Sequence, residues 1–267
     1  MRIAAGSVVI VTGASQGIGR ALCLQLAPRR MRLVLAARDQ ARLDALARQC
    51  EDLGATCLVL RTNVSSEDSC RALIEQSVER LGGIDVLVLN AGHTMWTRMD
   101  QLEHSHMIEE IMRVNYLGSA WPAFYALAHL KRSRGRIVAV ASVAGLTGVP
   151  ERAPYAASKH AMFGFFDSLR IELAGQGVSV TMIAPDFVVT EAHRRALGPD
   201  GRPLGTSPLA ESEVMSADEC ARRIVRAADK RQRLAILSTR ARLGRWLKLV
   251  RPSLVDRIAA RAIRQRH

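Results

Sequence analysis

Short apolar runs alternate with amphipathic stretches along most of the 267-residue chain. The runs are mostly five or six residues long and rich in Val, Ile and Leu, which is typical of strands buried in a parallel sheet. The stretches between them repeat apolar positions every three or four residues, as helices do. This alternation predicts one α/β domain, a doubly wound parallel sheet of about seven strands with right-handed crossovers.

The boundaries of these elements follow from periodicity and from end signals such as the capping box Ser216–Glu219. Strands are expected at Val8–Thr12, Arg32–Ala36, Thr56–Arg61, Asp85–Leu89, Gly135–Val140, Ser179–Ile183 and Leu234–Leu237. Helices are expected at Arg20–Pro28, Gln40–Leu53, Ser66–Leu81, from Pro154 onward and from Ser216 to Lys230. The stretch Gln101–Arg132 predicts one long helix or two abutting helices.

A glycine-rich turn joins the first predicted strand to the first predicted helix. Gly13, Gly17 and Gly19 follow the spacing G-x-x-x-G-x-G rather than the commoner G-x-G-x-x-G. Glycines in such a turn let the backbone approach a pyrophosphate, and the N-terminus of the next helix supplies free N–H groups and a positive dipole. The turn predicts a dinucleotide site, with a turn that binds no ligand as the alternative.

The end of the second predicted strand bears on which dinucleotide would bind. A site for NAD would place a carboxylate there, against the ribose 2′-hydroxyl. Here Arg38 follows the strand, and its planar guanidinium suits a 2′-phosphate. Asp39 lies twenty residues after Gly19 and is the rival candidate, but we expect it to cap the helix Gln40–Leu53. The sequence therefore favours NADP(H) over NAD(H).

Further polar positions follow the third and fourth predicted strands. Asn63 and Val64 lie where a side chain could reach an adenine ring, and Asn90-Ala91-Gly92 follows the fourth strand. The carboxyl ends of strands line the cofactor crevice in open α/β sheets. Turn chemistry is the alternative explanation for Asn90. Asn115 stands inside a predicted helix, where asparagine is mildly unfavourable, so we expect a specific reason for it.

The stretch Ser142–Lys159 brings together three side chains that can do proton chemistry. Tyr155 and Lys159 are four residues apart and share one helical face. An ammonium beside a phenol favours the phenolate, so we expect the pKa of Tyr155 to be lowered and the phenol to serve as a general acid or base. Ser142 ends the fifth predicted strand. A Tyr-x-x-x-Lys pair can arise by chance, so its meaning depends on the surrounding motifs.

Taken together, these motifs resemble the short-chain dehydrogenase/reductase family. The matching segments are Thr12–Gly19 (TGASQGIG), Asn90–Gly92, Asn115, Ser142 and Tyr155–Lys159 (YAASK), in the order and spacing of the family. Each is weak alone, and the combination is specific. The resemblance implies a Rossmann-type fold, hydride transfer between NADP(H) and a ketone or secondary alcohol, and a dimer or tetramer.

The resemblance also implies a role for individual residues. Tyr155 is the expected proton donor or acceptor, and Lys159 holds the nicotinamide ribose. Ser142 hydrogen-bonds the substrate carbonyl, and Asn115 fixes a water that links Lys159 to solvent. Two donors at the carbonyl oxygen would stabilise the negative charge that forms there. The expected cofactor contacts are Gly13, Ser15, Gln16, Gly17, Ile18, Gly19, Arg38, Asn63, Val64, Asn90, Ala91, Gly92, Tyr155, Lys159, Pro185, Val188 and Thr190. The expected substrate contacts are Ser142, Tyr155 and His93.

Two positions depart from the family pattern. The family commonly has Pro-Gly after the sixth strand, whereas this chain has Pro185-Asp186, which places a carboxylate near the nicotinamide or in the mouth of the substrate pocket. Asn63 stands where aspartate is usual and keeps the acceptor oxygen. The first departure bears on substrate preference and leaves the reaction class unchanged.

A loop rich in Gly and Pro, residues 186–215, follows the sixth predicted strand. A long loop beside a proposed site is usually a lid or a binding loop. We therefore expect it to shape the substrate pocket together with His93, Met95 and Trp96. The mixture of apolar and basic residues in this region suggests a hydrophobic ketone as substrate.

The composition of the sequence bears on the cellular location of the protein and on whether it binds a metal. No apolar run reaches eighteen residues, so no membrane span is expected, and we interpret Ile3–Ala14 as the start of the fold rather than a signal peptide. The five cysteines are scattered without a Cys-x-x-Cys motif, which favours free thiols and no metal site. Free thiols are typical of a reducing cytoplasm, so a cytoplasmic protein is expected.

Residues 1–239 form the expected catalytic domain, and residues 240–267 a basic helical tail. The tail holds nine Arg or Lys and one Asp, a net charge of +8 out of +13 for the whole chain. Four apolar residues recur in it at helical spacing: Leu243, Trp246, Leu247 and Val250. Pro252-Ser253 interrupts the pattern, and a second basic helix is expected from Leu254 to Arg264.

Three explanations of the tail remain open. The first is packing onto the core or onto a partner subunit, with the charges merely solvated. The second is an amphipathic helix lying on an anionic membrane surface, which would make the enzyme peripheral to the membrane and suit a lipid- or steroid-like substrate. Nucleic-acid binding is the least favoured, because no known reading motif accompanies the charge.

Two functions of different classes fit these observations. The first is an NADP(H)-dependent oxidoreductase acting on a small-molecule carbonyl or alcohol that is hydrophobic. The second is a non-catalytic sensor or scaffold that binds a dinucleotide and uses the tail as its working part. The set Ser142, Tyr155, Lys159 and Asn115 favours the enzyme, because a scaffold needs none of the four.

Overall fold

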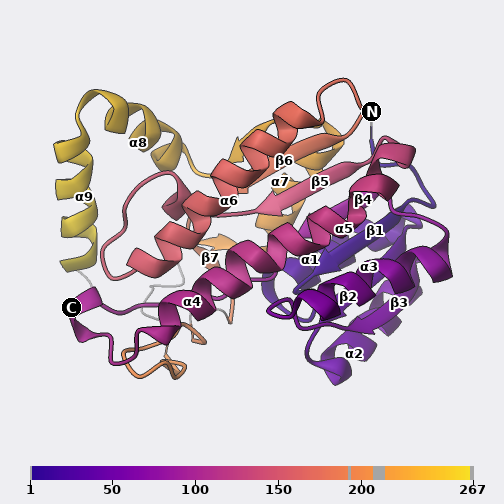
Figure 1. Cartoon of the computed structure of the whole chain (residues 1–267), viewed down its shortest axis with the longest axis horizontal. Coiled ribbons are helices and arrows are strands. Elements are labelled where there is room, and N and C mark those ends of the chain that lie inside the picture. Colours follow the sequence, from indigo (N-terminus) through magenta and orange to yellow (C-terminus); the bar gives the residue numbers. More distant parts are fainter. Residues whose placement is uncertain (1, 192–193, 207–213, 265–267) are drawn as a thin grey trace.

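The computed structural model describes residues 2–191, 194–206 and 214–264. Seven strands form one parallel sheet in the order β3-β2-β1-β4-β5-β6-β9 (Figure 1). The strands are β1 (Val8–Thr12), β2 (Arg32–Ala37), β3 (Thr56–Arg61), β4 (Val86–Leu89), β5 (Arg136–Val140), β6 (Ser179–Ala184) and β9 (Leu234–Ile236). The chain moves outward from β1 to β3 and then returns to place β4 on the other side of β1. A ligand crevice is expected at such a reversal of strand order.

Helices cover both faces of this sheet because successive strand residues point to opposite sides. Val9 and Val11 pack under α1 (Gly17–Leu26), α2 (Gln40–Asp52) and α7 (Ala217–Asp229). Val8 and Ile10 pack under α3 (Glu67–Leu81), α5 (Gly118–Ser133) and α6 (Ala153–Glu172), which lie across the near face in Figure 1. The predicted doubly wound α/β fold is confirmed.

The predicted long helical stretch is two helices joined by one wide turn. α4 (His106–Met112) and α5 are connected by η3 (Arg113–Leu117), which is a single π-helical turn. Asn115 lies at the centre of η3 and is fully buried. Such turns often mark functional sites, because they shift a side chain out of the regular helical register.

Asp39 has the role that the sequence predicted for it. Its side chain accepts a hydrogen bond from the backbone N–H of Arg42 at 3.1 Å and caps the N-terminus of α2. The carboxylate is therefore engaged at the helix end, as an N-cap residue should be. This leaves Arg38 as the charged residue immediately after β2.

The loop after β6 is partly described, since residues 192–193 and 207–213 of the predicted loop 186–215 lie outside the described residues. A short pair, β7 (Val188–Val189) with β8 (Met215–Ser216), joins the two ends of the loop. Leu197 forms an isolated bridge with Met95, which ties the loop to the segment after β4. Met95 itself belongs to a small buried cluster with Met107, so it is a core residue of this region.

Two helices follow β9, namely α8 (Thr239–Val250) and α9 (Pro252–Arg264). Figure 1 shows them in yellow, beyond the end of the sheet and packed against each other. The second helix begins at Pro252 instead of the predicted Leu254, because proline suits the first turn of a helix. No helix in the described part of the chain is long and apolar enough to span a membrane. All five cysteines are free.

Candidate active site

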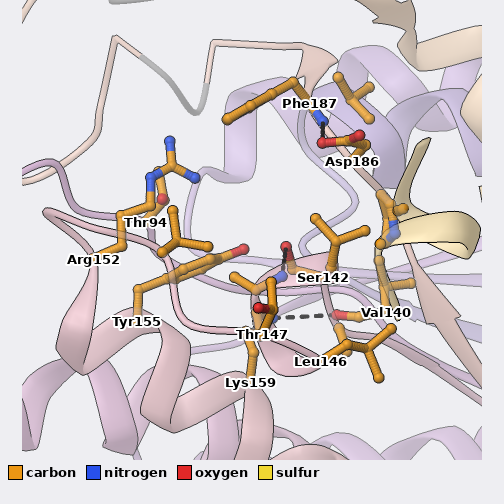
Figure 2. A pocket seen from close by; sticks show the side chains of 18 of the residues that line it. Thr94, Val140, Ser142, Leu146, Thr147, Arg152, Tyr155, Lys159, Asp186 and Phe187 are labelled. Carbon is orange, nitrogen blue, oxygen red and sulfur yellow. Dashed lines mark hydrogen bonds between the residues drawn. The ribbon is translucent and has the colours of Figure 1, made fainter. Parts of the chain in front are cut away.

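Ser142 stands just beyond the carboxyl end of β5. Its hydroxyl oxygen accepts a hydrogen bond from the backbone N–H of Ala144 at 3.2 Å and caps the short helix η4 (Val143–Gly145). Figure 2 shows this hydroxyl facing the phenol of Tyr155. The cap fixes the Ser142 side chain in place at the end of the strand.

Tyr155 and Lys159 come from the first two turns of α6, which has proline in its first turn. Lys159 is only 4% exposed, and its Nζ donates a hydrogen bond to the Val140 carbonyl oxygen at 3.2 Å. The same nitrogen lies 5.8 Å from the centroid of the Tyr155 ring. Tyr155, Lys159 and Ser142 line one cavity of about 330 Å³.

Burial is the main cause of the pKa shifts of both Lys159 and Tyr155. It lowers the pKa of Lys159 to about 8, and it raises the pKa of Tyr155. The Ser142 hydroxyl and the charge of Arg152 act in the opposite direction on the Tyr155 pKa without reversing the shift. The expected lowering of the Tyr155 pKa by Lys159 is therefore wrong for this structure, because the phenol is desolvated and the ammonium is directed at Val140.

Asn115 ties three segments together through its side-chain amide. Its Oδ1 accepts from the backbone N–H of His93 at 2.7 Å, and its Nδ2 donates to the His93 carbonyl at 3.0 Å and to Ser158 Oγ at 2.9 Å. Ser158 lies between Tyr155 and Lys159 in the sequence. The amide thus fixes the segment after β4 against α6, and the predicted role of holding a water stays a prediction.

Asn90 makes hydrogen bonds to the glycine turn through both its side chain and its backbone. Its Nδ2 donates to the carbonyl oxygens of Thr12 and Gly13, at 3.0 and 3.3 Å, while its backbone N–H donates to Thr12 Oγ1 at 3.0 Å. The side chain therefore holds the glycine turn against the end of β4. It also lines the cavities on both sides of that turn.

The glycine turn forms one edge of a second cavity of about 410 Å³. Gly13 has φ of +67°, and a Cβ there would lie 2.9 Å from Ala91 Cα. A Cβ on Gly19 would lie 2.1 Å from the Gly13 carbonyl oxygen, so only glycine permits this packing of α1 against the turn. The N-terminus of α1 has neither a side-chain cap nor an acidic residue in its first turn. Its N–H groups suit the phosphates of a dinucleotide.

Most of the predicted cofactor contacts line this second cavity. The residues that do so are Gly13, Ser15, Gln16, Gly17, Ile18, Arg38, Asn63, Val64, Asn90, Ala91, Gly92 and Thr190. Pro185 and Val188 line the first cavity with Tyr155 and Lys159. Gly19 and Asn115 line neither of the two cavities, because both serve the packing around them.

Two arginines that the sequence did not single out lie at or beside the second cavity: Arg195 lines it, and Arg42 contacts Gln16, which lines it. Arg38 Nη2 lies 3.4 Å from His93 Nε2. Burial is the main cause of the lowered pKa of His93, and the Arg38 charge adds to it. Arg42 donates to Gln16 Oε1 at 3.0 Å and to Glu191 Oε2 at 2.9 Å. In the sequence, the only indication of a role for Arg42 was its position in the first turn of the predicted helix Gln40–Leu53.

Asp186 lies in the wall of the first cavity, as its departure from the family pattern predicted. Its Oδ2 accepts from Ser238 Oγ at 2.9 Å and from Arg240 Nη2 at 3.0 Å. Ser238 is the N-cap of α8. The carboxylate thus attaches the start of the tail to the strand end beside the active site.

The tail helices supply part of the cavity wall, which the sequence did not predict. The residues that line it are Arg240, Ala241, Gly244, Arg245, Val255, Ile258 and Ala259. Lys248 Nζ also donates to the Leu146 carbonyl at 3.0 Å, which holds α8 against the segment after η4. Residues of the tail helices and residues of the segment between β5 and α6 therefore line the same cavity.

The predicted apolar face of the tail points away from the core. Leu243, Trp246 and Val250 are 67%, 69% and 79% exposed, and Leu249 is 72% exposed. Leu247, the fourth residue of the predicted face, is half-buried, and other residues of the tail helices line the cavity at the core. The packing of the tail onto the core thus leaves Leu243, Trp246 and Val250 exposed. A membrane surface and a partner subunit remain as explanations of the face.

His93, an expected substrate contact, lines both cavities. Trp96 stacks on Phe187, with ring centroids 6.1 Å apart, and lies behind the cavity wall.

Arg152, which the sequence did not single out, lines the cavity beside Tyr155. Its burial depends on contacts with segments remote in sequence, so no local pattern could reveal it.

The fold and the site together define a dinucleotide-dependent oxidoreductase. A glycine turn at the reversal of strand order adjoins a cavity that is lined by Ser142, Tyr155 and the buried Lys159. A sequence model of the family described as short chain dehydrogenase matches residues 7–198. The chain belongs to this family, as the motifs predicted.

Relatives and a solved structure agree with this assignment. The chain is 33% identical to 11-beta-hydroxysteroid dehydrogenase A of Sesamum indicum, over 94% of this chain and 74% of that protein. It is 34% identical to 11-beta-hydroxysteroid dehydrogenase-like 4A of Arabidopsis thaliana, over 94% of this chain and 82% of that protein. An alcohol dehydrogenase from the archaeon Thermococcus sibiricus, complexed with 5-hydroxy-NADP, superposes with a TM-score of 0.75 at 26% identity, covering 86% of this chain and 95% of that one.

Proposed function

We propose that the protein is an NADP(H)-dependent oxidoreductase that interconverts an apolar, steroid- or lipid-like ketone and its secondary alcohol. The observation that carries the proposal is the placement of Ser142, Tyr155 and Lys159 in one cavity that adjoins the glycine-turn cavity. Six residues line both cavities: Ile18, Asn90, Gly92, His93, Thr94 and Thr190. A nicotinamide at this shared wall would supply the hydride.

The side chains that line the first cavity would carry out the other tasks of the reaction: proton donation, stabilisation of the carbonyl oxygen and binding of the ribose. The Tyr155 phenol is protonated at neutral pH and would donate its proton to the carbonyl oxygen during reduction. The Ser142 hydroxyl donates a hydrogen bond to the same oxygen and stabilises its developing charge. Lys159 lies below the phenol, where it would hold a ribose hydroxyl. The apolar wall excludes water from these groups.

Substitution of the phenol tests the reaction. Tyr155→Phe keeps the ring and removes the proton, so kcat should fall by about a hundredfold or more, the range that general acid catalysis contributes. The measurement is NADPH oxidation with a panel of cyclic and long-chain ketones. Unchanged turnover of an identified substrate by Tyr155→Phe would falsify the enzymatic role.

The preference for NADP(H) rests on Arg38 at the rim of the second cavity. The solved relative complexed with an NADP analogue supports it. Arg38→Asp should raise KM for NADPH at least about tenfold and leave KM for NADH equal or lower, because a carboxylate suits the 2′-hydroxyl and repels a phosphate. A wild-type enzyme that prefers NADH would overturn this part of the proposal.

The apolar substrate is supported by the lining of the first cavity and by the names of the relatives. Val140, Leu146, Val149, Phe187 and Val188 line it together with Val255 and Ile258 of the tail. Curated relatives are named hydroxysteroid dehydrogenases. A sensor or scaffold that binds a dinucleotide is the rival function. It would bind NADPH and turn over none of the ketones or alcohols in the panel.

We also propose that the tail lies on an anionic membrane surface from the cytoplasmic side. Its exposed apolar residues (Leu243, Trp246, Leu249 and Val250) stand beside basic ones such as Arg242 and Arg251. Apolar side chains that insert at the interface and cations that meet lipid headgroups are the mark of such helices. The mouth of the substrate cavity would then face the lipid in which an apolar substrate dissolves.

Vesicle binding tests the membrane proposal. The protein should sediment with vesicles containing phosphatidylserine, less so as salt rises, and deletion of residues 240–267 should abolish binding. Trp246→Ser and Leu243→Ser together should weaken it, whereas Ile171→Ser on an exposed position of α6 should not. Equal binding by the truncated protein would refute the proposal. A dimer that dissociates in the Trp246 variant would assign the face to a partner subunit instead.

A further inference from the structure

Arg38 and His93 meet at the rim of the second cavity, although they lie far apart in the sequence. Arg38 follows β2, His93 follows β4, and both line that cavity. The Arg38 Nη2 lies 3.4 Å from His93 Nε2. Because arginine has no acceptor atom, its N–H donates and the imidazole nitrogen accepts. The contact thus joins the carboxyl ends of two strands that β1 separates in the sheet.

The imidazole of His93 is in the form that can accept this hydrogen bond. A ring that accepts at Nε2 is neutral and carries its proton on Nδ1. Burial lowers the pKa of His93 and the Arg38 charge lowers it further, while Glu110 acts in the opposite direction. The Nδ1 atom lies 4.0 Å from Glu110 Oε1, so the proton is on the side of the carboxylate. The ring is therefore neutral at pH 7 and above.

The backbone of His93 is fixed by one buried side chain. Asn115 Oδ1 accepts from the His93 N–H at 2.7 Å, and Asn115 Nδ2 donates to the His93 carbonyl at 3.0 Å. Asn115 itself is fully buried in η3. Arg38 is exposed, and a long exposed side chain loses rotamer freedom when it takes one position. A ring on so well-held a backbone can keep the guanidinium in that position before any ligand arrives.

The partner of Arg38 differs from those of two neighbouring arginines. Arg42 lies 2.9 Å from a Glu191 oxygen and 3.3 Å from an Asp39 oxygen. Arg195 lies 3.3 Å from the same Glu191 oxygen. In the described part of the chain, Arg38 forms an ion pair with no carboxylate, and its guanidinium contacts the imidazole instead. A carboxylate would compete with a phosphate for the guanidinium, whereas a neutral ring orients it and leaves its charge available.

We propose that His93 is a positioning residue for NADP(H), which holds the Arg38 guanidinium at the place where the 2′-phosphate of the cofactor binds. The inference rests on the proposed preference for NADP(H) and adds a residue that determines it. The ring engages one N–H group of the guanidinium and leaves others for a bidentate contact with the phosphate. NAD(H) has a hydroxyl at this position, so its binding does not depend on the contact.

Two other roles of His93 make different predictions. If the ring only packs the segment after β4, its replacement should weaken the binding of NADP(H) and NAD(H) equally. If its contact with Arg38 closes the empty cavity, its replacement should tighten the binding of both. A positioning role predicts a loss that is confined to ligands with a 2′-phosphate.

The experiment measures binding rather than turnover, with two pairs of ligands that differ only in the 2′-phosphate. Calorimetric titrations at pH 8, where His93 is neutral, compare 2′,5′-ADP with 5′-AMP and NADP⁺ with NAD⁺. The wild type should prefer the 2′-phosphorylated member of each pair by about tenfold or more, the effect of one charge-assisted contact. His93→Phe keeps a ring and removes the acceptor. It should reduce this preference about fivefold and leave the affinity for 5′-AMP and NAD⁺ within about twofold.

Further variants assign the effect to the contact. His93→Gln places an amide oxygen near the position of Nε2 and should restore most of the preference. In an Arg38→Met background, His93→Phe should change the preference no further, because both residues act through one contact. His129→Phe removes a similar contact on the surface of α5, where Arg132 Nη2 lies 2.6 Å from His129 Nδ1, and should leave the preference unchanged.

The outcomes separate this inference from the proposed function. A preference that survives His93→Phe, an equal change for both members of each pair, or a further loss in the Arg38→Met background would overturn the role of His93 alone. A wild type that binds both members of each pair equally would overturn it together with the assignment of Arg38. No carbonyl substrate is present in these titrations, so they are independent of the reaction that Tyr155→Phe tests.

Discussion

At the scale of single residues, burial rather than sequence neighbours sets the chemistry of the site. Lys159 and Tyr155 share a helical face, as their spacing predicted, yet each titrates according to its desolvation. Both shifts favour the neutral forms. The phenol therefore stays protonated at neutral pH, and the amine loses its proton near pH 8, well below its ordinary range.

Lys159→Met should stabilise the protein at neutral pH. The folded state lowers the pKa of Lys159 from 10.5 to about 8, so the unfolded chain binds more protons between these values. Below about pH 8 the burial of the ammonium costs stability, and the cost fades as the pH rises toward 10.5. We expect a gain of roughly 2 kcal/mol at pH 7 that shrinks at pH 10, reduced by the lost hydrogen bond to Val140.

Urea unfolding at both pH values measures this gain, with Lys131→Met, an exposed lysine of α5, as the control. The control should change stability by only a few tenths of a kcal/mol. A Lys159→Met variant that is less stable than the wild type by the same amount at pH 7 and pH 10 would show that the ammonium is well accommodated.

Asn115→Ala should destabilise the protein by about 2–3 kcal/mol, because it strands the backbone groups of His93 and the hydroxyl of Ser158 in a buried site. The unfolding midpoint in urea measures the loss. Asn63→Ala removes a side chain whose partner is the adjacent Ser65 at the surface, and should cost less than about 1 kcal/mol. Similar costs for the two variants would show that Asn115 does not hold the segments together.

At the scale of elements, two irregular features position the site. The π turn η3 directs Asn115 inward between α4 and α5, and a regular helix there would place a different side chain at that point. Asp186, at the end of β6, connects to the N-cap of α8 and so joins the sheet to the tail. Both features couple segments far apart in the chain to the strand ends that carry the catalytic groups.

Asp186→Ala should loosen α8. Removing the carboxylate frees Ser238 and Arg240, so amides in the first turns of α8 should exchange hydrogen about tenfold faster, while those of α7 are unchanged. Hydrogen exchange followed by mass spectrometry provides the measurement. Asp200→Ala, at an exposed carboxylate that pairs with Arg202, serves as the control. Unaltered exchange in α8 would assign its anchoring to Lys248 alone.

At the scale of the whole molecule, the tail completes the substrate cavity and leaves the cofactor cavity untouched. Of the described residues of α8 and α9, several line the 330 Å³ cavity and none lines the 410 Å³ cavity. α8 buries none of its residues, so we expect the sheet and its helices to keep their fold without it. We therefore expect the tail to contribute to substrate recognition and to leave cofactor binding to the rest of the chain.

Deletion of residues 240–267 should therefore separate these two functions. kcat/KM for a large apolar ketone should fall by about tenfold or more, since one wall that shields it from water is lost. The dissociation constant for NADPH should stay within about twofold, and the circular dichroism spectrum of the core should persist. A loss of NADPH affinity as large as the loss of ketone turnover would contradict this division.

Much of the fold and most of the site residues could be predicted from the sequence because their signals are local. Buried parallel strands appear in the sequence as apolar runs. The turn at Gly13–Gly19 needs glycine because the backbone packed around it leaves no room for a Cβ. The paired spacing of Tyr155 and Lys159 is likewise a property of one helix. The π turn at Asn115 was missed as a distinct element, since its local pattern is that of an ordinary helix.

What the sequence by itself determined is the order of strands and helices, the glycine turn, and the alignment of Ser142, Tyr155 and Lys159 at adjoining ends of a strand and a helix. These depend on periodicity, capping and turn sterics over a few residues. Only the tertiary structure decided the titration of the phenol, the entry of Arg152 into the cavity and the outward direction of the tail's apolar face. Each of these depends on which distant segments remove water from a side chain, and burial of that kind is a property of the packed molecule.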